Sequence, residues 1–377
     1  MATLPHDIDE ISTRFDIPGE YVRAELCGSG HINDTYFAEF RQQRKMRRVV
    51  LQRINHVVFK KPVELMDNFA RVTHHLQEKL LKASGADAQR QGLRLIPARD
   101  GSFLHVDPEG NHWRCLHYIE KSYSLDRATS PEDARQAGVA FARFQKFLAD
   151  FPGQSLHETI PYFHHTPKRF ETFQEVVRDD THQRRASCAP EIEWALSQES
   201  MTRLVIGKLE SGELPVRVTH NDTKFNNVLF CEETDEAICV TDLDTVMPGT
   251  VLYDFGDQIR TTTTHAPEDE TDLGKVVIDL EMFRGLVEGY LCEAHTFLTA
   301  GERELLAFSG RLITFQIGLR FLTDYLQGDV YFKTHRPSHN LDRARAQFAL
   351  CRSMERVQGP MEKIVAECAA AAVPPVS

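Results

Sequence analysis

Hydrophobic and polar positions alternate with a period of two over much of the first 120 residues. This alternation is typical of half-buried strands. Strands are expected at residues 21–40 (two strands), 49–54, 93–98, 102–106 and 112–119. A short helical pattern occurs at residues 7–15. A longer one runs from Pro62 to about Lys82, where the proline suits the first turn of a helix. This part of the chain is therefore predicted to be a small β-rich layer with one long helix.

The period changes to a helical one after residue 120. Residues 132–151 are strongly amphipathic, with Phe141, Phe144 and Leu148 on one face. Further helices are expected at residues 167–178, 190–210, 271–296, 302–327 and 340–370. A strand-rich segment at residues 216–244 interrupts them. The pattern predicts an α+β fold, with a larger and mainly helical C-terminal part.

The strand-rich segment holds the most distinctive polar residues of the chain. It contains the run VTHNDTKFNN at residues 218–227 and, after a polar turn, the run VTDLD at residues 240–244. Phosphoryl transfer needs an acidic residue that orients an acceptor hydroxyl, and oxygen ligands that hold Mg²⁺. Asp222 suits the first role, and Asn227 with Asp242 suits the second.

Two neighbouring side chains leave alternatives open. Lys224 could stabilise the charge of a phosphoryl group in transfer, or could be an ordinary surface lysine. Asp244 could be a second metal ligand or a substrate contact. His220 is expected to pack and to form hydrogen bonds within the loop.

The motif His220-Asn221-Asp222-x4-Asn227, followed by Asp242, resembles the aminoglycoside phosphotransferase-like kinases. Segments 217–224, 242–245, 247–249 and 254–257 are similar to those of the N-acetylhexosamine 1-kinases in particular. The resemblance implies a bilobal protein-kinase-like fold. It implies an N-terminal nucleotide-binding lobe at residues 1–119, a hinge at 120–124, and a C-terminal catalytic and sugar-binding lobe at 125–377.

The resemblance also assigns roles to individual residues. The nucleotide would be bound by Gly28, Ser29, Gly30, Gln52, Tyr118, Ile119 and Glu120, and the sugar by Asn33, Asp222, Asp244, Arg320 and Tyr331. Gln52 stands where related kinases have a phosphate-binding lysine. Asp254 would support the catalytic loop through hydrogen bonds. From the residues alone, the preferred interpretation is that Arg320 is a helix-surface arginine and Tyr331 a core aromatic, and only the resemblance reverses it.

Composition narrows the class of protein further. The chain has 44 Lys and Arg against 55 Asp and Glu, a net charge of −11, which argues against general nucleic-acid binding. No apolar run is long enough for a transmembrane helix, and the N-terminus lacks a signal pattern. The eight cysteines include no C-x-x-C pair, so reduced thiols and a cytoplasmic location are expected.

The sequence therefore predicts an ATP- and Mg²⁺-dependent kinase that phosphorylates the anomeric hydroxyl of an N-acetylhexosamine. Its ligands would be a sugar and a nucleotide, with no nucleic acid and no membrane. Two alternatives stay open. One is another kinase of the same fold, acting on an aminoglycoside, choline or homoserine. The other is a non-catalytic nucleotide-binding regulator, suggested by the missing strand lysine.

Overall fold

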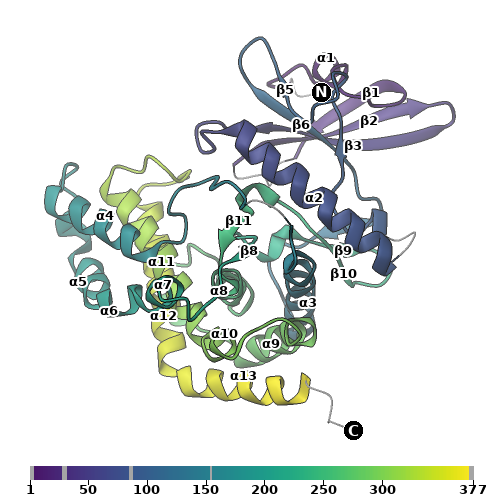
Figure 1. Cartoon of the computed structure of the whole chain (residues 1–377). Coiled ribbons are helices and arrows are strands. Elements are labelled where there is room, and N and C mark those ends of the chain that lie inside the picture. Colours follow the sequence, from purple (N-terminus) through teal and green to yellow (C-terminus); the bar gives the residue numbers. More distant parts are fainter. Residues whose placement is uncertain (1–3, 28–31, 85–87, 153–154, 373–377) are drawn as a thin grey trace, which may run out of the picture. The chain divides into compact units, whose positions relative to one another are not determined.

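The computed structural model describes residues 4–27, 32–84, 88–152 and 155–372. The chain forms two compact units, each made of segments that are discontinuous in sequence (Figure 1). The first unit comprises residues 1–123, 151–160 and 229–247, and the second comprises 124–150, 161–228 and 248–377. The continuous lobes predicted at residues 1–119 and 125–377 stay a prediction.

The first unit is built on an antiparallel sheet. Its strands are β1 (Glu20–Leu26), β2 (Asp34–Gln42), β3 (Lys45–Ile54), β4 (Leu95–Ile96), β5 (His105–Val106) and β6 (His112–His117). Their order is β1-β2-β3-β6-β4, and β5 also pairs with β6. The strand pattern expected from the alternation is confirmed, although β4 and β5 are shorter than predicted.

The two faces of this sheet differ, because side chains alternate along each strand. Tyr36, Leu51 and Trp113 lie on one face, in a core that also includes residues of α1 (Ile8–Ser12). Gln52 on β3 and Arg114 on β6 lie on the other face. There the Arg114 guanidinium is stacked on a ring of α2 (Pro62–Ser84), so α2 packs against this face. A smaller sheet, β10 (Ala237–Val240), β9 (Val228–Cys231) and β7 (Ser122–Ser124), completes the strands.

The second unit is mainly helical. Its helices are α3 (Pro131–Leu148), α4 (Thr166–Asp179), α5 (Ala189–Ser197), α6 (Glu199–Thr202), α7 (Leu204–Glu210), α8 (Val251–Thr262), α9 (Leu280–Ala294), α10 (Ala300–Glu304), α11 (Leu306–Leu326), α12 (His339–Arg356) and α13 (Gln358–Ala372). A short pair of strands, β8 (Arg217–Thr219) and β11 (Met247–Gly249), precedes α8. No helix among the described residues is long and apolar enough to cross a membrane.

Glycines bring the central helices of this unit close together. A Cβ atom at Gly289 of α9 would lie 1.9 Å from the Arg135 carbonyl oxygen of α3, far inside van der Waals contact. A Cβ atom at Gly256 of α8 would lie 2.4 Å from the Ser309 carbonyl oxygen of α11. These positions therefore require glycine, and the backbones of α3 and α9, and of α8 and α11, are in direct contact.

Several predicted helices have different bounds. The helix expected at residues 190–210 is divided into α5, α6 and α7. The backbone leaves helical geometry at Gln198, between α5 and α6, and Arg203 separates α6 from α7. The helix expected from residue 271 starts only at Leu280, because the Asp279 side chain caps it by accepting from two backbone N–H groups. Helix α8, at Val251–Thr262, was not predicted at all.

Candidate active site

The loop that follows β8 holds the predicted catalytic residue. Asn221 has a left-handed backbone with φ of 65°, which asparagine tolerates better than most residues. The Thr219 hydroxyl donates to the Asn221 side-chain oxygen at 3.1 Å, and the Asn221 carbonyl oxygen lies 2.8 Å from Nε2 of His164. These hydrogen bonds stabilise the left-handed backbone of Asn221, and this conformation sets the position of the next residue, Asp222.

Asp254 on α8 supports the same loop through hydrogen bonds to its backbone. Its side chain is completely buried, and it accepts hydrogen bonds from the backbone N–H of His220 at 3.0 Å and of Asn221 at 2.7 Å. Gln145 on α3 donates to the same carboxylate at 2.7 Å, and the Tyr290 hydroxyl of α9 donates to Gln145. Burial raises the pKa of the Asp254 carboxyl, while His220 and these hydrogen bonds oppose the shift. The supporting role predicted for Asp254 is confirmed.

His220 has no exposed surface. Its ring lies with its centre 5.6 Å from those of both Phe141 and Phe144 of α3, in edge-on contact. Its Nδ1 accepts a hydrogen bond from the Asp222 backbone N–H at 3.3 Å. His220 therefore packs and forms hydrogen bonds within the loop, as expected from the sequence.

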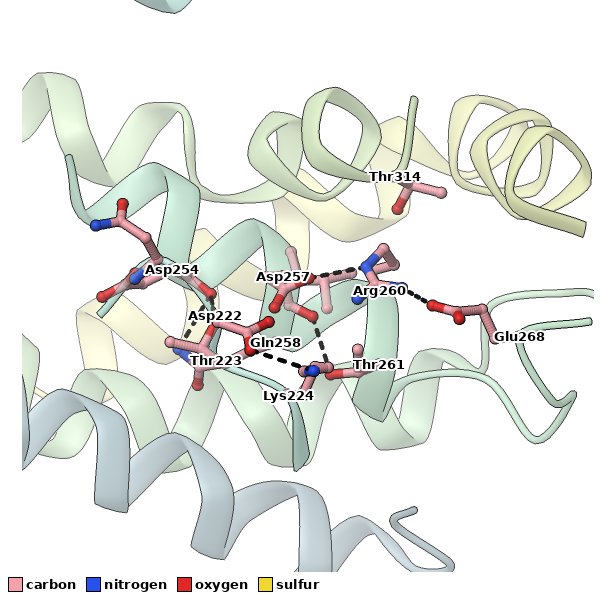
Figure 2. A network of polar contacts seen from close by, with 12 residues as sticks. Asp222, Thr223, Lys224, Asp254, Asp257, Gln258, Arg260, Thr261, Glu268 and Thr314 are labelled. Atoms are coloured by element: carbon pink, nitrogen blue, oxygen red, sulfur yellow. Dashed lines mark hydrogen bonds and ion pairs between the residues drawn. The ribbon is translucent and has the colours of Figure 1, made fainter. Parts of the chain in front are cut away.

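Asp222 and Lys224 form an ion pair at the surface of this loop (Figure 2). The Lys224 ammonium lies 3.2 Å from Oδ2 of Asp222, and the two side chains are 32% and 21% exposed. Burial alone would raise the pKa of Asp222, but the charge of Lys224 lowers it below its ordinary value. Asp222 is therefore ionised at neutral pH, and its carboxylate can accept a hydrogen bond from a hydroxyl group.

A second charged group lies nearby on α8. Arg260 is almost fully buried and donates to Asp257 and to Glu268, each at 2.8 Å (Figure 2). Burial would lower the pKa of the Arg260 guanidinium, but both carboxylates raise it, with a net rise. A cavity of about 330 Å³ in the second unit is lined by Lys224, Arg260, Glu268 and Gln347, among other residues. Arg260 thus pairs with both carboxylates, and its single positive charge balances one of the two.

Asn227, a predicted metal ligand, lies in the second unit at the end of the short helical turn Phe225–Asn227. Its amide nitrogen donates to the Asp222 carbonyl oxygen at 2.8 Å, and the side chain is 7% exposed. A carboxamide binds a cation through its oxygen, so Oδ1 is the atom that could do so here. A neutral carboxamide oxygen is an ordinary ligand of Mg²⁺.

Asp242, the other predicted metal ligand, belongs to the first unit. Its backbone is left-handed, with φ of 59° and ψ of 58°, directly before the helical turn Leu243–Thr245. Such strained backbone in a residue other than glycine is frequent at functional sites. Asp244 is 2% exposed, and its Oδ2 accepts a hydrogen bond from Asn33 at 2.6 Å. The structure therefore brings together two predicted sugar-binding residues, Asn33 and Asp244.

Gln52 lies on the sheet face that α2 covers. Its amide nitrogen donates to the Thr35 hydroxyl at 3.0 Å, and its oxygen accepts from Nε of Arg114 at 2.9 Å. The amide is thus held from both ends. The other predicted nucleotide-binding residues of this region, Gly28, Ser29 and Gly30, lie outside the described residues.

The segment Tyr118-Ile119-Glu120 leaves strand β6. The Arg48 guanidinium lies 4.0 Å from the centre of the Tyr118 ring and forms an ion pair with Glu120. The Ile119 carbonyl oxygen accepts a hydrogen bond from the Ser122 hydroxyl at 2.7 Å. Contacts with an arginine and a hydroxyl group therefore fix the Tyr118 and Glu120 side chains and the Ile119 backbone, where nucleotide binding is predicted.

Arg320 and Tyr331, predicted to bind the sugar, lie against each other in the second unit. The Arg320 guanidinium is 5.0 Å from the ring centre of Phe163, 5.5 Å from that of Tyr331 and 5.3 Å from that of Phe332. Arg169 donates to the Phe163 carbonyl oxygen at 3.4 Å. Burial, and then the charge of Arg320, lower the pKa of Arg169 to about 10. Among the described residues, no carboxylate lies within ion-pair distance of either guanidinium.

This arginine–aromatic cluster (Phe163, Arg169, Arg320, Tyr331 and Phe332) lies beside the catalytic loop. Its connection is His164, whose ring bonds to the Asn221 carbonyl oxygen. Burial lowers the pKa of His164 to about 4, and the charge of Arg320 contributes to the shift. His164 is therefore neutral, and it links the segment that carries Phe163 to the loop.

Asp324 on α11 holds the segment that carries Tyr331, a role that sequence reasoning missed. One carboxylate oxygen accepts from the backbone N–H of Val330 at 2.9 Å and of Tyr331 at 2.8 Å. The other accepts from Phe332 N–H and from the Asn340 amide, both at 2.9 Å. Only the clustering of Asp324 with the following Gly328-Asp329 turn could have indicated such a loop anchor.

Comparison with known proteins identifies the family. The model of the phosphotransferase enzyme family, APH, matches residues 23–284, which is more than half of the chain. The chain belongs to the APH phosphotransferase family. It is therefore a phosphotransferase, a kinase of small molecules, and the protein-kinase-like fold predicted for it is confirmed.

Solved structures agree with this fold. An aminoglycoside phosphotransferase from Alicyclobacillus acidocaldarius is 12% identical with a TM-score of 0.54, and the match covers 98% of both chains. A choline kinase from Cryptosporidium parvum is 12% identical with a TM-score of 0.55, covering 96% of this chain and 99% of that one. At such low identity the likeness establishes the fold of this APH-family chain and leaves its acceptor to be inferred from the site.

Proposed function

We propose that this APH-family kinase transfers the γ-phosphoryl group of ATP to the anomeric C1 hydroxyl of an N-acetylhexosamine, N-acetylglucosamine or N-acetylgalactosamine. The observation that carries the proposal is the arginine–aromatic cluster, in which Arg169 and Arg320 have no carboxylate partner among the described residues. Guanidinium groups donate hydrogen bonds and accept none. They suit the hydroxyl and acetamide oxygens of a sugar, whose apolar face can stack on Tyr331.

The same observation disfavours the rival acceptors that carry positive charge. An aminoglycoside or choline would be repelled by two adjacent guanidinium groups, and like charges brought together oppose binding. In the nearby cavity Glu268 is paired with Arg260, although Asp126 also lines it. A neutral acceptor fits the arginine–aromatic cluster.

In the proposed reaction Asp222 accepts a hydrogen bond from the C1 hydroxyl and orients it. As the new bond between the C1 oxygen and the γ-phosphorus forms, the bond from that phosphorus to the β–γ bridging oxygen breaks and ADP leaves. The hydroxyl proton passes to the Asp222 carboxylate. Its lowered pKa is compatible with this role, because phosphoryl transfer has a loose transition state in which the proton moves late. Lys224 neutralises charge that develops on the transferred group.

The proposal gives Mg²⁺ two oxygen ligands, Oδ1 of Asn227 and the carboxylate of Asp242. The donor set fits this hard cation, since a carboxamide and a carboxylate both offer oxygen ligands. When bound, Mg²⁺ would neutralise negative charge on the nucleotide phosphates. The retention of Asp222, Asn227 and Asp242 together supports a catalyst over a nucleotide-binding regulator.

The test is ³¹P NMR of the protein with ATP, Mg²⁺ and one acceptor at a time. The panel comprises N-acetylglucosamine, N-acetylgalactosamine, glucose, galactose, choline, homoserine and kanamycin. We expect an anomeric sugar-phosphate signal with the two acetamido sugars. A phosphate ester of choline, homoserine or kanamycin without any sugar phosphate would overturn the proposed acceptor. No turnover with the full panel, by a protein that binds ATP, would favour the regulator.

A further inference from the structure

A buried arginine lies at the centre of the sheet of the first unit. Arg114 is on β6, directly opposite Gln52 on β3, and only 1% of its surface is exposed. A guanidinium keeps its proton in a protein, so its burial requires compensating partners. The groups that contact Arg114 indicate the role of its positive charge.

Arg114 contacts several separate parts of the unit. Its Nε donates to the Gln52 side-chain oxygen at 2.9 Å, and its Nη1 forms an ion pair with Asp244. The planar group lies 4.3 Å from the centre of the Phe69 ring on α2. One side chain therefore connects β6, β3, α2 and the turn at residues 242–245.

Asp244 is held from its other side as well. Its second oxygen accepts from the Asn33 amide at 2.6 Å, and the Asn33 oxygen accepts from the Asn55 backbone N–H at 3.0 Å. Both carboxylate oxygens are thus engaged. Asp242 lies only two residues before this anchor and has the strained left-handed backbone. The orientation of Asp242 consequently depends on how firmly Asp244 is held.

Stability alone is a weak reason for such an arrangement. A buried ion pair is often no more stabilising than well-packed apolar side chains of the same volume, because both charges lose their hydration. The central part of β3, from Val49 to Gln52, carries no cation. Arg114 therefore supplies the positive charge in the interior of this sheet face.

We propose that Arg114 is a positioning residue that anchors the Asp242–Asp244 turn to the sheet and orients the Gln52 amide. Through these two contacts it acts on Mg²⁺ and nucleotide binding indirectly. The inference rests on the proposed use of Mg²⁺ and nucleotide by this kinase. It predicts that loss of Arg114 weakens the coupling between Mg²⁺ and nucleotide binding.

The experiment measures ADP affinity by titration calorimetry, with and without Mg²⁺, and needs no acceptor or turnover. For Arg114→Met we expect the Mg²⁺-dependent gain in ADP affinity to fall at least tenfold, with Mg²⁺-free affinity within threefold of wild type. Arg114→Lys keeps the charge beside Asp244 and should recover part of the gain. The matched control is Arg53→Met, which removes a partly exposed arginine on β3 that pairs with Asp34. It should leave the gain unchanged.

Three outcomes overturn the inference. They are a wild-type Mg²⁺-dependent gain in Arg114→Met, an equal loss in Arg53→Met, and no Mg²⁺-dependent gain in the wild-type protein. If Arg114→Met does not fold, the neutral double variant Arg114→Met/Asp244→Asn replaces it, with the same expected loss and the same refuting result. The outcome is separable from that of the NMR panel, because a kinase with a different acceptor would still bind Mg²⁺ and ADP.

Discussion

The support of the catalytic loop by Asp254 gives the sharpest quantitative prediction. In Asp254→Asn, one carbonyl oxygen and one NH₂ group replace a carboxylate that accepts from His220 N–H, Asn221 N–H and the Gln145 amide. The new NH₂ group must face at least one of these donors. Leaving one buried donor unsatisfied costs about 1–3 kcal/mol, and each remaining bond loses about 1 kcal/mol of charge assistance. Removal of the buried charge offsets part of this, so the net loss is about 2–4 kcal/mol.

The same substitution should slow the chemical step. The hydrogen bonds from the His220 and Asn221 backbone N–H groups fix the backbone next to Asp222. Misplacement of a reacting group by about 1 Å can cost roughly 100-fold in rate. We expect kcat to fall about 10–100-fold while KM for ATP stays close to wild type. Calorimetry should show Tm lowered by about 4–16 °C, given roughly 2–4 °C per kcal/mol for a unit of this size.

A control of similar stability separates loop geometry from general destabilisation. Met361 on α13 is fully buried and distant in sequence from the loop, and Met361→Ala should also cost about 2–5 kcal/mol. Its kcat at a temperature where both variants are folded should equal that of the wild type. If Asp254→Asn lost stability but kept wild-type kcat, the claim that these hydrogen bonds position Asp222 would be refuted.

Three further substitutions test neighbouring parts of the site. Lys224→Met should lower kcat about 100–1000-fold, and the acidic limb of the kcat–pH profile should move to higher pH, since Lys224 lowers the pKa of Asp222. An unmoved limb would contradict the ion pair. Asp324→Asn should raise KM for the acceptor about tenfold at constant kcat, because Tyr331 loses its anchored backbone. Equal effects on KM for ATP would point to general damage. Arg169→Met should raise the same acceptor KM about tenfold, and steady-state kinetics with unchanged acceptor KM would remove Arg169 from the site.

The local parts of the site could be predicted because their residues are close in sequence. Asp222, Lys224 and Asn227 fall within six positions, and the structure holds them through contacts inside the same loop. The strands of the first unit follow from their alternation, since one face of the sheet covers a core. Nothing in the structure tests the roles given to the predicted site residues, so these roles stay predictions.

Helix α8 was missed although its apolar residues Val251, Leu252, Phe255 and Ile259 recur at helical spacing. Nearly every residue of Val251–Thr262 is buried, including the polar side chains of Asp254, Asp257, Gln258 and Arg260. The burial of these polar residues depends on partners in other parts of the chain, which no local pattern reveals. The supporting residue Arg114 escaped notice for a related reason. The ion pair of Arg114 spans 130 positions, a separation over which no local pattern gives information.

Hydrogen bonds between buried helices and close helix contacts at glycines together explain how Asp222 acquires its position. Asp222 is exposed enough to meet a substrate, yet its backbone rests on a chain of hydrogen bonds from Asp254 through Gln145 to Tyr290, on three different helices. Those helices can share such bonds only because glycines let their backbones touch, as at Gly289. A reactive group that must stay partly hydrated cannot be fixed by its own packing. Its position therefore has to come from buried residues behind it, and in this kinase those residues are polar because they must hold the backbone of a loop.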